Sequence, residues 1–156
     1  MVKVLNMKGS NEPKVIRVTE EDGTNVISFK KSPALPTRVR YLITNNNNEK
    51  IGTIEKSRSN FSIVNLPEIN ISINDDKIKI KKSMKELKDV YEIEGNGFSI
   101  IGNWFGPTFS ITKNEKVVAS VKVEQEELGR SYLADIIDKS NEEQIISILF
   151  AVSWID

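Results

Sequence analysis

The sequence contains no cysteine and no histidine. The lack of cysteine excludes disulfides, thiolate nucleophiles and cysteine metal ligands. The lack of histidine removes the most frequent general base, the usual zinc ligand and every Ser-His or Cys-His catalytic arrangement. We therefore expect no catalytic residues, no metal site and no cofactor.

The chain also lacks net charge, because 22 Lys and Arg residues balance 22 Asp and Glu residues. No overall field draws such a protein to nucleic acid or to a membrane, so an electrostatic partner has to bind a local patch. Residues 1–10 hold no apolar stretch of signal-peptide length, which predicts a cytoplasmic protein. At 156 residues the chain has the size of one domain, and we expect a single domain over residues 1–156.

Apolar residues recur mostly at every second position. In residues 77–81 two isoleucines alternate with three lysines, and in residues 117–123 the odd-numbered positions are apolar. A period of two places alternate residues on opposite faces of a sheet. Clusters of Asn, Asp and Gly, such as residues 45–48 and 74–76, separate these segments and suit tight hairpin turns. Many short strands joined by tight turns predict an antiparallel β-sandwich or barrel.

The C-terminal residues change from this pattern to that of a helix. Ser140 with Glu143 three residues later matches a capping box, which predicts that a helix begins there. The 11 residues from Ile145 to Ile155 are apolar except for two serines, so apolar side chains lie on every side of the helix. Such a helix is surrounded by protein or by lipid, and spanning a bilayer takes ~20 apolar residues. We therefore predict a buried helix inside a closed or nearly closed β-barrel, without a transmembrane segment.

Residues 94–123 concentrate four of the eight glycines and one of the two tryptophans. The glycines suit tight turns, and the aromatic pair among them would close a barrel end or pack on the core. Their spacing does not match a dinucleotide-binding loop, and a strand pattern rather than a helix follows. We interpret the segment as a turn cluster rather than a ligand site. Its residues are Gly95, Gly97, Gly102, Asn103, Trp104, Phe105 and Gly106.

The segment "YEIEGNGFSIIGNWFGPTFSITKNEKVVASVKV" (residues 91–123), with "YLADI" and "EEQIISILFAVSWID" after it, resembles the LURP-one-related (LOR) family of the tubby C-terminal-like superfamily. The resemblance is specific from Tyr91 to Asp156, whereas residues 14–82 share only the rhythm of hairpins. It implies one tubby-like domain: a closed antiparallel β-barrel of about twelve strands around a buried hydrophobic C-terminal helix. It also implies a distant relation to phospholipid scramblases. Residues 83–90 depart from the family, because their composition is more typical of a helix than of a strand and loop.

Two rows of cations form the candidate binding site. If their strands are neighbours, the rows make a cationic stripe that can bind phosphates. Tubby domains bind phosphoinositide headgroups through basic residues, so the resemblance adds a hypothesis of anionic phospholipid binding at the membrane periphery. The alternative, favoured by nearby acids such as Glu55 and Glu68, is a solvated outer face. The two rows are Arg38 and Arg40 on one strand and Lys77, Lys79 and Lys81 on another.

Pairs of acids are the remaining candidates. Neighbouring residues of a strand point to opposite faces, so Asp75 and Asp76 are expected at a hairpin tip. Glu92 and Glu94 share a face, but the sequence supplies no nucleophile or base beside them. No loop has the ligand spacing of a calcium site.

These observations predict a non-enzymatic binding or scaffold module that binds an anionic membrane surface or a protein partner, and not nucleic acid, through its exterior. The alternative function is a small-molecule binder, or an enzyme that uses carboxylates at a barrel mouth. A barrel filled by its own helix leaves little room for a substrate, which favours the binding module.

Overall fold

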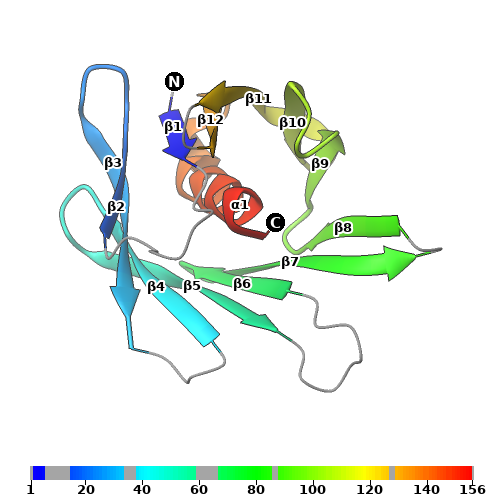
Figure 1. The fold of residues 1–156 in the computed structure, drawn as a ribbon. Helices are drawn as coiled ribbons and strands as arrows, with labels where there is room; N and C mark the ends of the chain where they lie inside the picture. Colours follow the sequence, from blue (N-terminus) through cyan, green and yellow to red (C-terminus); the bar gives the residue numbers. More distant parts are fainter. Residues whose placement is uncertain are drawn as a thin grey trace.

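The computed structural model of the protein describes residues 2–5, 15–33, 38–58, 67–85, 88–126 and 129–155. Within these ranges the chain is mainly β, with a short 3₁₀ turn and one helix at the C-terminal end (Figure 1). The strands are β1 (Val2–Leu5), β2 (Val15–Thr19), β3 (Asn25–Ser32), β4 (Arg38–Asn45), β5 (Lys50–Arg58), β6 (Pro67–Ile73), β7 (Asp76–Lys85), β8 (Lys88–Glu94), β9 (Phe98–Gly102), β10 (Thr108–Lys113), β11 (Lys116–Glu126) and β12 (Gly129–Ile136). The 3₁₀ turn η1 spans Lys139–Asn141, and the helix α1 spans Glu142–Ile155.

The strands form two antiparallel sheets. The larger sheet has seven strands in the order β2-β3-β4-β5-β6-β7-β8, so each strand pairs with its neighbour in sequence. The smaller sheet has five strands in the order β1-β12-β11-β10-β9, and the pairing of β1 with β12 brings the first and last strands together. Asn48, Asn74 and Asn114 hold positive φ angles of 64°, 53° and 49° in the hairpin turns. The turn chemistry predicted from the Asn and Gly clusters is therefore confirmed.

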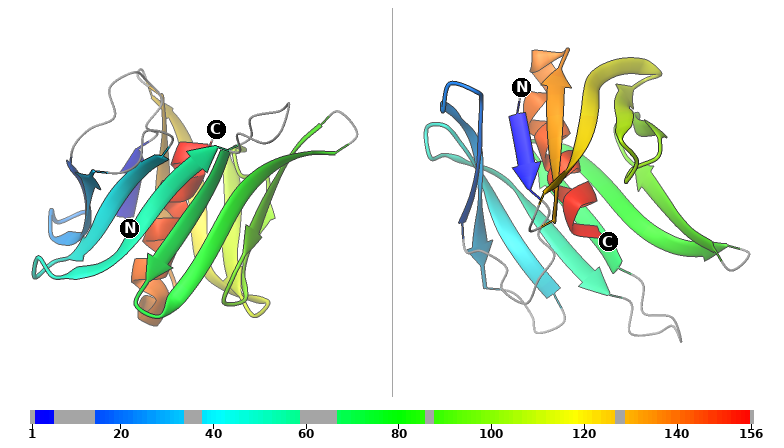
Figure 2. Two further views of the ribbon diagram at one scale, coloured as in Figure 1. Left: turned by 90° about the horizontal axis from the view of Figure 1, so that it is seen from below. Right: turned by 45° about the horizontal axis from the view of Figure 1, so that its top comes forward.

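The helix α1 lies between the two sheets (Figures 1 and 2). The chain passes from one sheet to the other between β1 and β2 and again between β8 and β9. Among the strands that the structure describes, no hydrogen-bonded ladder crosses either of these seams. The prediction of a mainly β fold with a C-terminal helix is confirmed, whereas closure of the strands into a barrel is not and stays a prediction.

The predicted alternation of apolar and polar residues is clearest on β6. Ile69, Ile71 and Ile73 are buried against the interior, while Asn70 and Ser72 between them are exposed. The neighbouring strand β7 continues the pattern with buried isoleucines and outward lysines. The larger sheet therefore has one apolar inner face and one polar outer face.

The predicted alternation is wrong at the start of β11. Val117 is 45% exposed, whereas the consecutive residues Val118 and Ala119 are both buried. The cause is a β-bulge, because the pairing with β10 shifts between Ile111 and Thr112 and leaves Val118 as the extra residue. The bulge turns Val117 from the expected core position to the outer face.

The helix-like composition of residues 83–90 does not produce a helix. Residues 83–85 lie in β7 and residues 88–90 lie in β8, with Ser83 opposite Val90 in the ladder. Pairing between the strands overrides the local propensity of these residues. The strand that the family resemblance implies is therefore present over the described residues.

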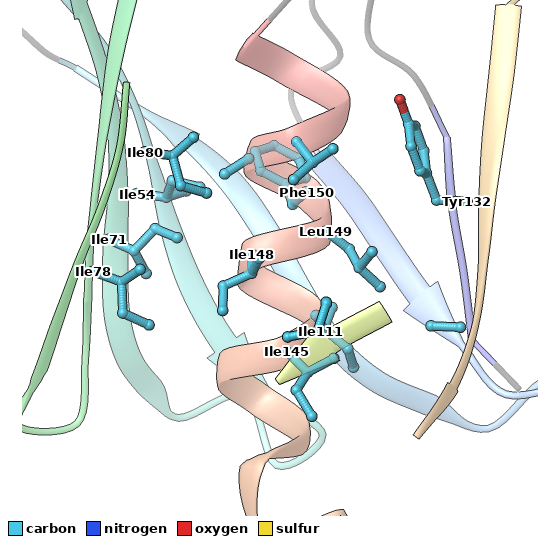
Figure 3. Packing of buried hydrophobic residues seen from close by; sticks show 14 of the residues in the cluster. Ile54, Ile71, Ile78, Ile80, Ile111, Tyr132, Ile145, Ile148, Leu149 and Phe150 are labelled. Carbon is cyan, nitrogen blue, oxygen red and sulfur yellow. The ribbon is translucent and has the colours of Figure 1, made fainter. Parts of the chain in front are cut away.

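All residues of α1 from Ile145 to Ile155 are buried. The helix contacts β5, β6 and β7 of the larger sheet and β1 and β12 of the smaller sheet. Ile148 points toward the isoleucines of the larger sheet, and Leu149 points toward the smaller sheet (Figure 3). A helix that is apolar on every side needs protein on every side. The prediction of a buried C-terminal helix is confirmed.

Aromatic rings pack around Phe150 near the middle of α1. The ring of Phe150 stacks on Phe29 of β3 with the centroids 4.1 Å apart. It meets Tyr41 of β4 and Trp154 of α1 edge to face, each at a centroid distance of 5.5 Å. Such pairs add about 0.5–1.5 kcal/mol each beyond the burial of their area. The cluster therefore fixes the position of α1 against β3 and β4.

The N-terminal end of α1 is preceded by η1, whose N-cap is Asp138. The carboxylate of Asp138 accepts hydrogen bonds from the hydroxyl and the backbone N–H of Ser140, at 2.6 and 3.1 Å. These bonds from Ser140 lower the pKa of Asp138. The prediction that Ser140 caps the helix is wrong, because the chain first makes a 3₁₀ turn.

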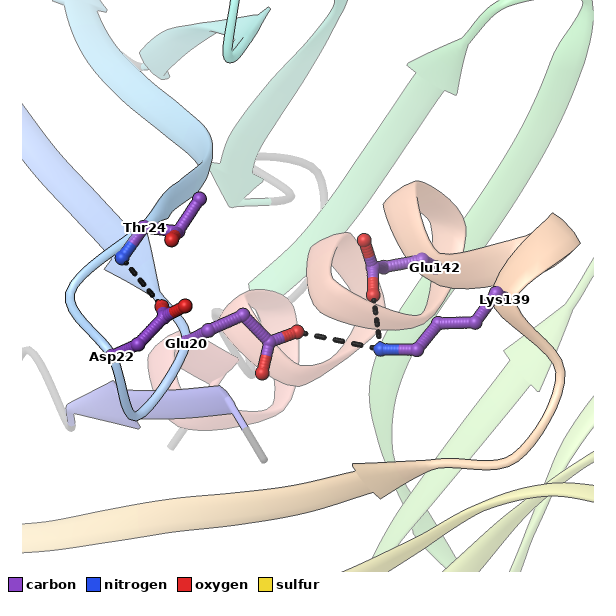
Figure 4. Close-up of polar contacts among 5 residues, drawn as sticks. All are labelled: Glu20, Asp22, Thr24, Lys139 and Glu142. Carbon is purple, nitrogen blue, oxygen red and sulfur yellow. Dashed lines mark hydrogen bonds and ion pairs between the residues drawn. The ribbon is translucent and has the colours of Figure 1, made fainter.

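Lys139 of η1 forms ion pairs with two acids. Its ammonium group lies 3.0 Å from Glu142 of α1 and 3.3 Å from Glu20 of the β2–β3 turn, and so links the start of the helix to the larger sheet (Figure 4).

The C-terminal end of α1 meets a lysine from the larger sheet. The ammonium group of Lys56 on β5 donates a hydrogen bond of 2.7 Å to the backbone carbonyl of Trp154. The same ammonium group lies 5.5 Å from the centroid of the Trp154 ring. A cation at this end of a helix complements the negative end of the helix dipole. Lys56 therefore ties the last turn of α1 to the sheet.

Candidate functional site

The two rows of cations lie on the outer face of the larger sheet. Arg38 and Arg40 come from β4, and Lys77, Lys79 and Lys81 come from β7. Two strands, β5 and β6, separate β4 from β7. The rows are therefore not neighbours, and they do not form one continuous stripe.

Acids occupy the space beside the arginine row. The register places Glu55 of β5 directly beside Arg40 and, on its other side, beside Asn70 of β6. Glu55 binds Arg38 at 3.0 Å and Arg40 at 2.7 Å, and its side chain is only 17% exposed. One carboxylate thus holds both arginines, as the hypothesis of a solvated outer face expects.

The lysine row is partly neutralised in the same way. Lys79 lies 3.1 Å from Glu68, and Lys81 lies 3.0 Å from Glu94 and 3.6 Å from Glu92. The hydrogen bond and the charge of Glu94 raise the pKa of Lys81. Lys81 therefore stays protonated and engaged with acids of β8.

Lys77 differs from the other four cations. It is exposed, and within the described residues it has no ion-pair partner. A hollow of about 400 Å³ lies beside it on the outer face, lined also by Lys79, Asn70, Ser72 and Glu94. An ammonium group, an amide and a hydroxyl are groups that donate hydrogen bonds to phosphate oxygens. Of the two predicted rows, only the hollow beside Lys77 therefore remains a candidate anion site.

The predicted turn cluster contains three glycines with positive φ: Gly95 at 126°, Gly97 at 74° and Gly102 at 106°. A Cβ atom on Gly95 would collide with the carbonyl oxygen of Lys77. Glycine is needed at this position both for its backbone angle and for its close approach to β7. Gly95 and Gly97 turn the chain from β8 of the larger sheet into β9 of the smaller sheet, whereas Gly102 ends β9 and leads to β10 within the smaller sheet.

The remaining motif residues form the loop between β9 and β10. Asn103 accepts a 3.0 Å hydrogen bond from the backbone N–H of Phe105, and its carbonyl accepts one of 3.0 Å from Gly106. Trp104 and Phe105 contact Tyr91 of β8, with ring centroids 5.7 and 4.9 Å apart. Because β8 belongs to the larger sheet, these rings join the two sheets across the β8–β9 seam. The geometry of the motif is that of a packed corner.

The acidic pairs do not converge on a common site. Asp75 lies in the β6–β7 turn, and Asp76 at the start of β7 accepts a 3.1 Å hydrogen bond from Gln144 of α1. Glu92 and Glu94 both face Lys81.

Over residues 2–5, 15–33, 38–58, 67–85, 88–126 and 129–155, no group of three or more acidic residues could hold a metal ion. In the same ranges, no helix has the length and apolar character required to cross a bilayer.

Two features were missed by the sequence analysis. The first is the contact of Lys56 with the end of α1. Lys56 lies two residues after Ile54 and therefore on the same, inner face of β5, and a lysine at an inward position indicates a polar partner in the interior. A second hollow, on the outer face of the smaller sheet, depends on Ser110 and Ser120. These serines lie on different strands and meet only through the register, so no local pattern indicates them.

The sequence matches the family described as LURP-one-related (LOR) over residues 3–152. No curated protein and no solved structure matches the chain. The matched region begins in β1 and ends within α1, so it includes both sheets and most of the buried helix. The match therefore extends over the N-terminal half, where the sequence alone shows only hairpins.

Proposed function

From the premise that the chain belongs to the LURP-one-related family, we propose that it is a non-enzymatic module that binds anionic phospholipid headgroups at its outer surface. The carrying observation is the burial of α1 between the sheets, from Ile145 to Ile155. Since the helix fills this space, a ligand has to bind outside it. The proposed location is the cytoplasmic surface of a membrane.

The hollow at Lys77 is the part of the outer face that suits a headgroup best. Arg38 and Arg40 share Glu55, so an anion has to compete with a carboxylate there. Lys77 has no ion-pair partner among the described residues, and Lys79 pairs with the exposed Glu68. Glu94, which lies opposite Lys79 in the ladder and also lines the hollow, is already bound to Lys81 at 3.0 Å. Exposed ion pairs of this kind exchange easily for another anion.

We also propose that the strands close into a barrel, as the tubby-like resemblance implies. The contacts of Tyr91 on β8 with Trp104 and Phe105 support this proposal, because they cross the β8–β9 seam. The β1–β12 ladder makes β1 the edge strand of the smaller sheet, so β1 is the strand that would close the other seam. A closed barrel would keep the outer face rigid, so that a headgroup could bind without rearrangement of the sheet.

The expected affinity is modest, because few charges take part. A lysine near an anionic membrane surface is worth about 1 kcal/mol, so two lysines contribute about 2 kcal/mol, or roughly thirtyfold in affinity. Salt screens exposed charges over a Debye length of about 8 Å at physiological ionic strength. Binding should therefore be peripheral, reversible and weaker at high salt.

The test is sedimentation of the full chain with phosphatidylcholine vesicles, with and without about 20% phosphatidylserine or a phosphoinositide. We expect pelleting only with the anionic vesicles. Replacing both Lys77→Glu and Lys79→Glu should abolish it, because each reversal changes two charges and costs roughly thirtyfold. Inorganic phosphate as a competitor distinguishes a site for phosphate alone from a site for the lipid surface.

The matched control is the pair Arg38→Glu and Arg40→Glu, which changes the net charge by the same amount on the same face. This pair should retain clearly more binding than the lysine pair. Equal loss in both pairs would contradict the location at Lys77. Failure of the unaltered protein to pellet with any anionic vesicle would contradict the proposed function.

A further inference from the structure

The outer face of the smaller sheet has a different composition from that of the larger sheet. The register aligns Ile101 of β9, Ser110 of β10, Ser120 of β11 and Asp135 of β12 in one row across the sheet. The two serines in the middle of the row have short side chains, whereas the residues at its ends are longer. This difference in length creates a depression over β10 and β11.

A hollow of about 510 Å³ lies at this depression. Its lining includes Ile101, Ser110, Ser120, Leu133 and Asp135. Ile101 is 60% exposed, so most of its apolar side chain is accessible at the edge of this hollow. The smaller sheet therefore presents an exposed apolar side chain next to a hollow with a hydroxyl-lined floor.

Other exposed apolar residues lie on the same sheet. Val117 on β11 is 45% exposed as a result of the bulge, and Ile137, which follows β12, is 61% exposed. On the larger sheet the comparable exposed residue is Val15, at 45%. Of the large hydrophobic residues exposed in the described parts of the chain, three lie on or beside the smaller sheet and one on the larger sheet. Exposed apolar side chains are therefore more frequent on the smaller sheet than on the larger one, and Ile101 is the one that lines the hollow.

The charges on this face complement each other. Lys122 lies directly opposite Leu133 in the ladder, and Asp135 lies opposite Ser120, so Lys122 and Asp135 are diagonal neighbours. The side chain of Lys122 is 65% exposed, and its partner within the chain is Glu124, at 3.3 Å. Asp135 is exposed and has no ion-pair partner within the described residues.

A second copy of the chain is the partner that these features fit. In a two-fold interface each contact occurs twice, so a face that carries both an acid and a base can pair with itself. The net charge of zero means that two copies do not repel each other. A strongly charged partner, by contrast, would find only a few isolated charges on this face.

We propose that the outer face of the smaller sheet is the interface of a homodimer, in which Lys122 of each copy pairs with Asp135 of the other. A two-fold axis that runs between Lys122 and Asp135 brings Leu133 of both copies close together. The same axis covers the exposed Ile101 with β9 and β10 of the second copy. The larger sheet, with its cations, stays outside this interface and free for other partners.

The experiment is sedimentation velocity of the full chain over a series of protein concentrations. We expect a monomer–dimer equilibrium with a dissociation constant on the order of 10 µM. Either Lys122→Asp or Asp135→Lys alone should weaken the dimer on the order of a hundredfold, because each change creates two like-charged pairs. The double variant Lys122→Asp/Asp135→Lys should restore dimer formation, since it exchanges the charges without changing their pairing.

Two further variants separate the interface from general effects. Ile101→Asp should also weaken the dimer, whereas Val15→Asp, at an exposed residue of the larger sheet, should leave it unchanged. Every altered residue is exposed, so the fold should tolerate the changes, and circular dichroism can verify that each variant is folded. A monomer at every concentration would overturn the proposal, and so would a dimer that tolerates both single reversals or a double variant that stays monomeric. The lipid experiment does not depend on these outcomes.

Discussion

The inner and outer faces of the larger sheet are made of alternate residues of the same strands, yet the inner face packs in the core and the outer face is exposed to solvent. On β6 and β7 the inner residues Ile71, Ile78 and Ile80 are at most 1% exposed and pack in the core with α1. The outer residues of the same strands are lysines, acids and small polar groups that pair with each other at the surface.

Because the two faces differ in burial, stability and binding can be altered by substitutions at different residues. Burial of one large apolar side chain contributes about 1.5–3 kcal/mol. An exposed ion pair contributes about 0–1 kcal/mol. Substitutions on the outer face should therefore change binding without unfolding the protein, whereas substitutions on the inner face should unfold it.

The largest expected effect comes from Phe150→Ala at the centre of the interior. Phe150 is fully buried and contacts three other rings, so its loss leaves a cavity that the sheet cannot fill. We expect a loss of about 3–5 kcal/mol in the free energy of unfolding, measured by urea denaturation. Val15→Ala on the outer face is the control and should stay within about 0.5 kcal/mol. Similar losses for both variants would erase the distinction between the faces.

A smaller effect is expected for Lys56→Met, which tests the contact between the inner face of the larger sheet and the end of α1. Methionine keeps the apolar stem but removes the ammonium group that binds the Trp154 carbonyl. We expect a loss of about 1–2 kcal/mol, because a charged hydrogen bond at the helix end is removed. The outer-face change Lys79→Met should cost only a few tenths of a kcal/mol. An unchanged denaturation midpoint in Lys56→Met would show that this contact does not hold the helix.

The smallest effect is expected for Glu55→Gln on the outer face. The change removes the charge that Arg38 and Arg40 share while keeping the shape of the side chain. We expect a loss of at most about 1 kcal/mol, and less at high salt because screening weakens the pairs. Thermal unfolding at two salt concentrations measures both quantities. A salt-independent loss of several kcal/mol would mean that the outer face carries stability after all.

Much of the fold could be predicted from the sequence because it depends on local patterns. The alternation of isoleucine with lysine in β7 specified which residues face inward, and the apolar run from Ile145 to Ile155 specified a buried helix. The start of the helix was predicted less well. Ser140 and Glu143 resemble a capping box, but the choice between an α turn and a 3₁₀ turn there depends on the contacts of Asp138 and Lys139.

The candidate sites were harder to predict because they depend on which strands are neighbours. The arginine and lysine rows share a face, but whether β4 and β7 adjoin each other was left open by the residues alone. The bulge at Val118 and the meeting of Ser110 with Ser120 depend on the register of β10 with β11. A shift of one residue in that register would reverse the face of every side chain, and composition does not report it.

The enclosure of α1 can be measured directly, because the chain contains no cysteine and accepts a single reporter thiol. Ser147→Cys places the thiol at a fully buried residue of α1, and Ser72→Cys places it at an exposed residue of the larger sheet. We predict that a thiol reagent modifies the buried cysteine at least about a thousandfold more slowly than the exposed one, because access requires unfolding. Equal rates in the folded protein would contradict a helix enclosed by the two sheets.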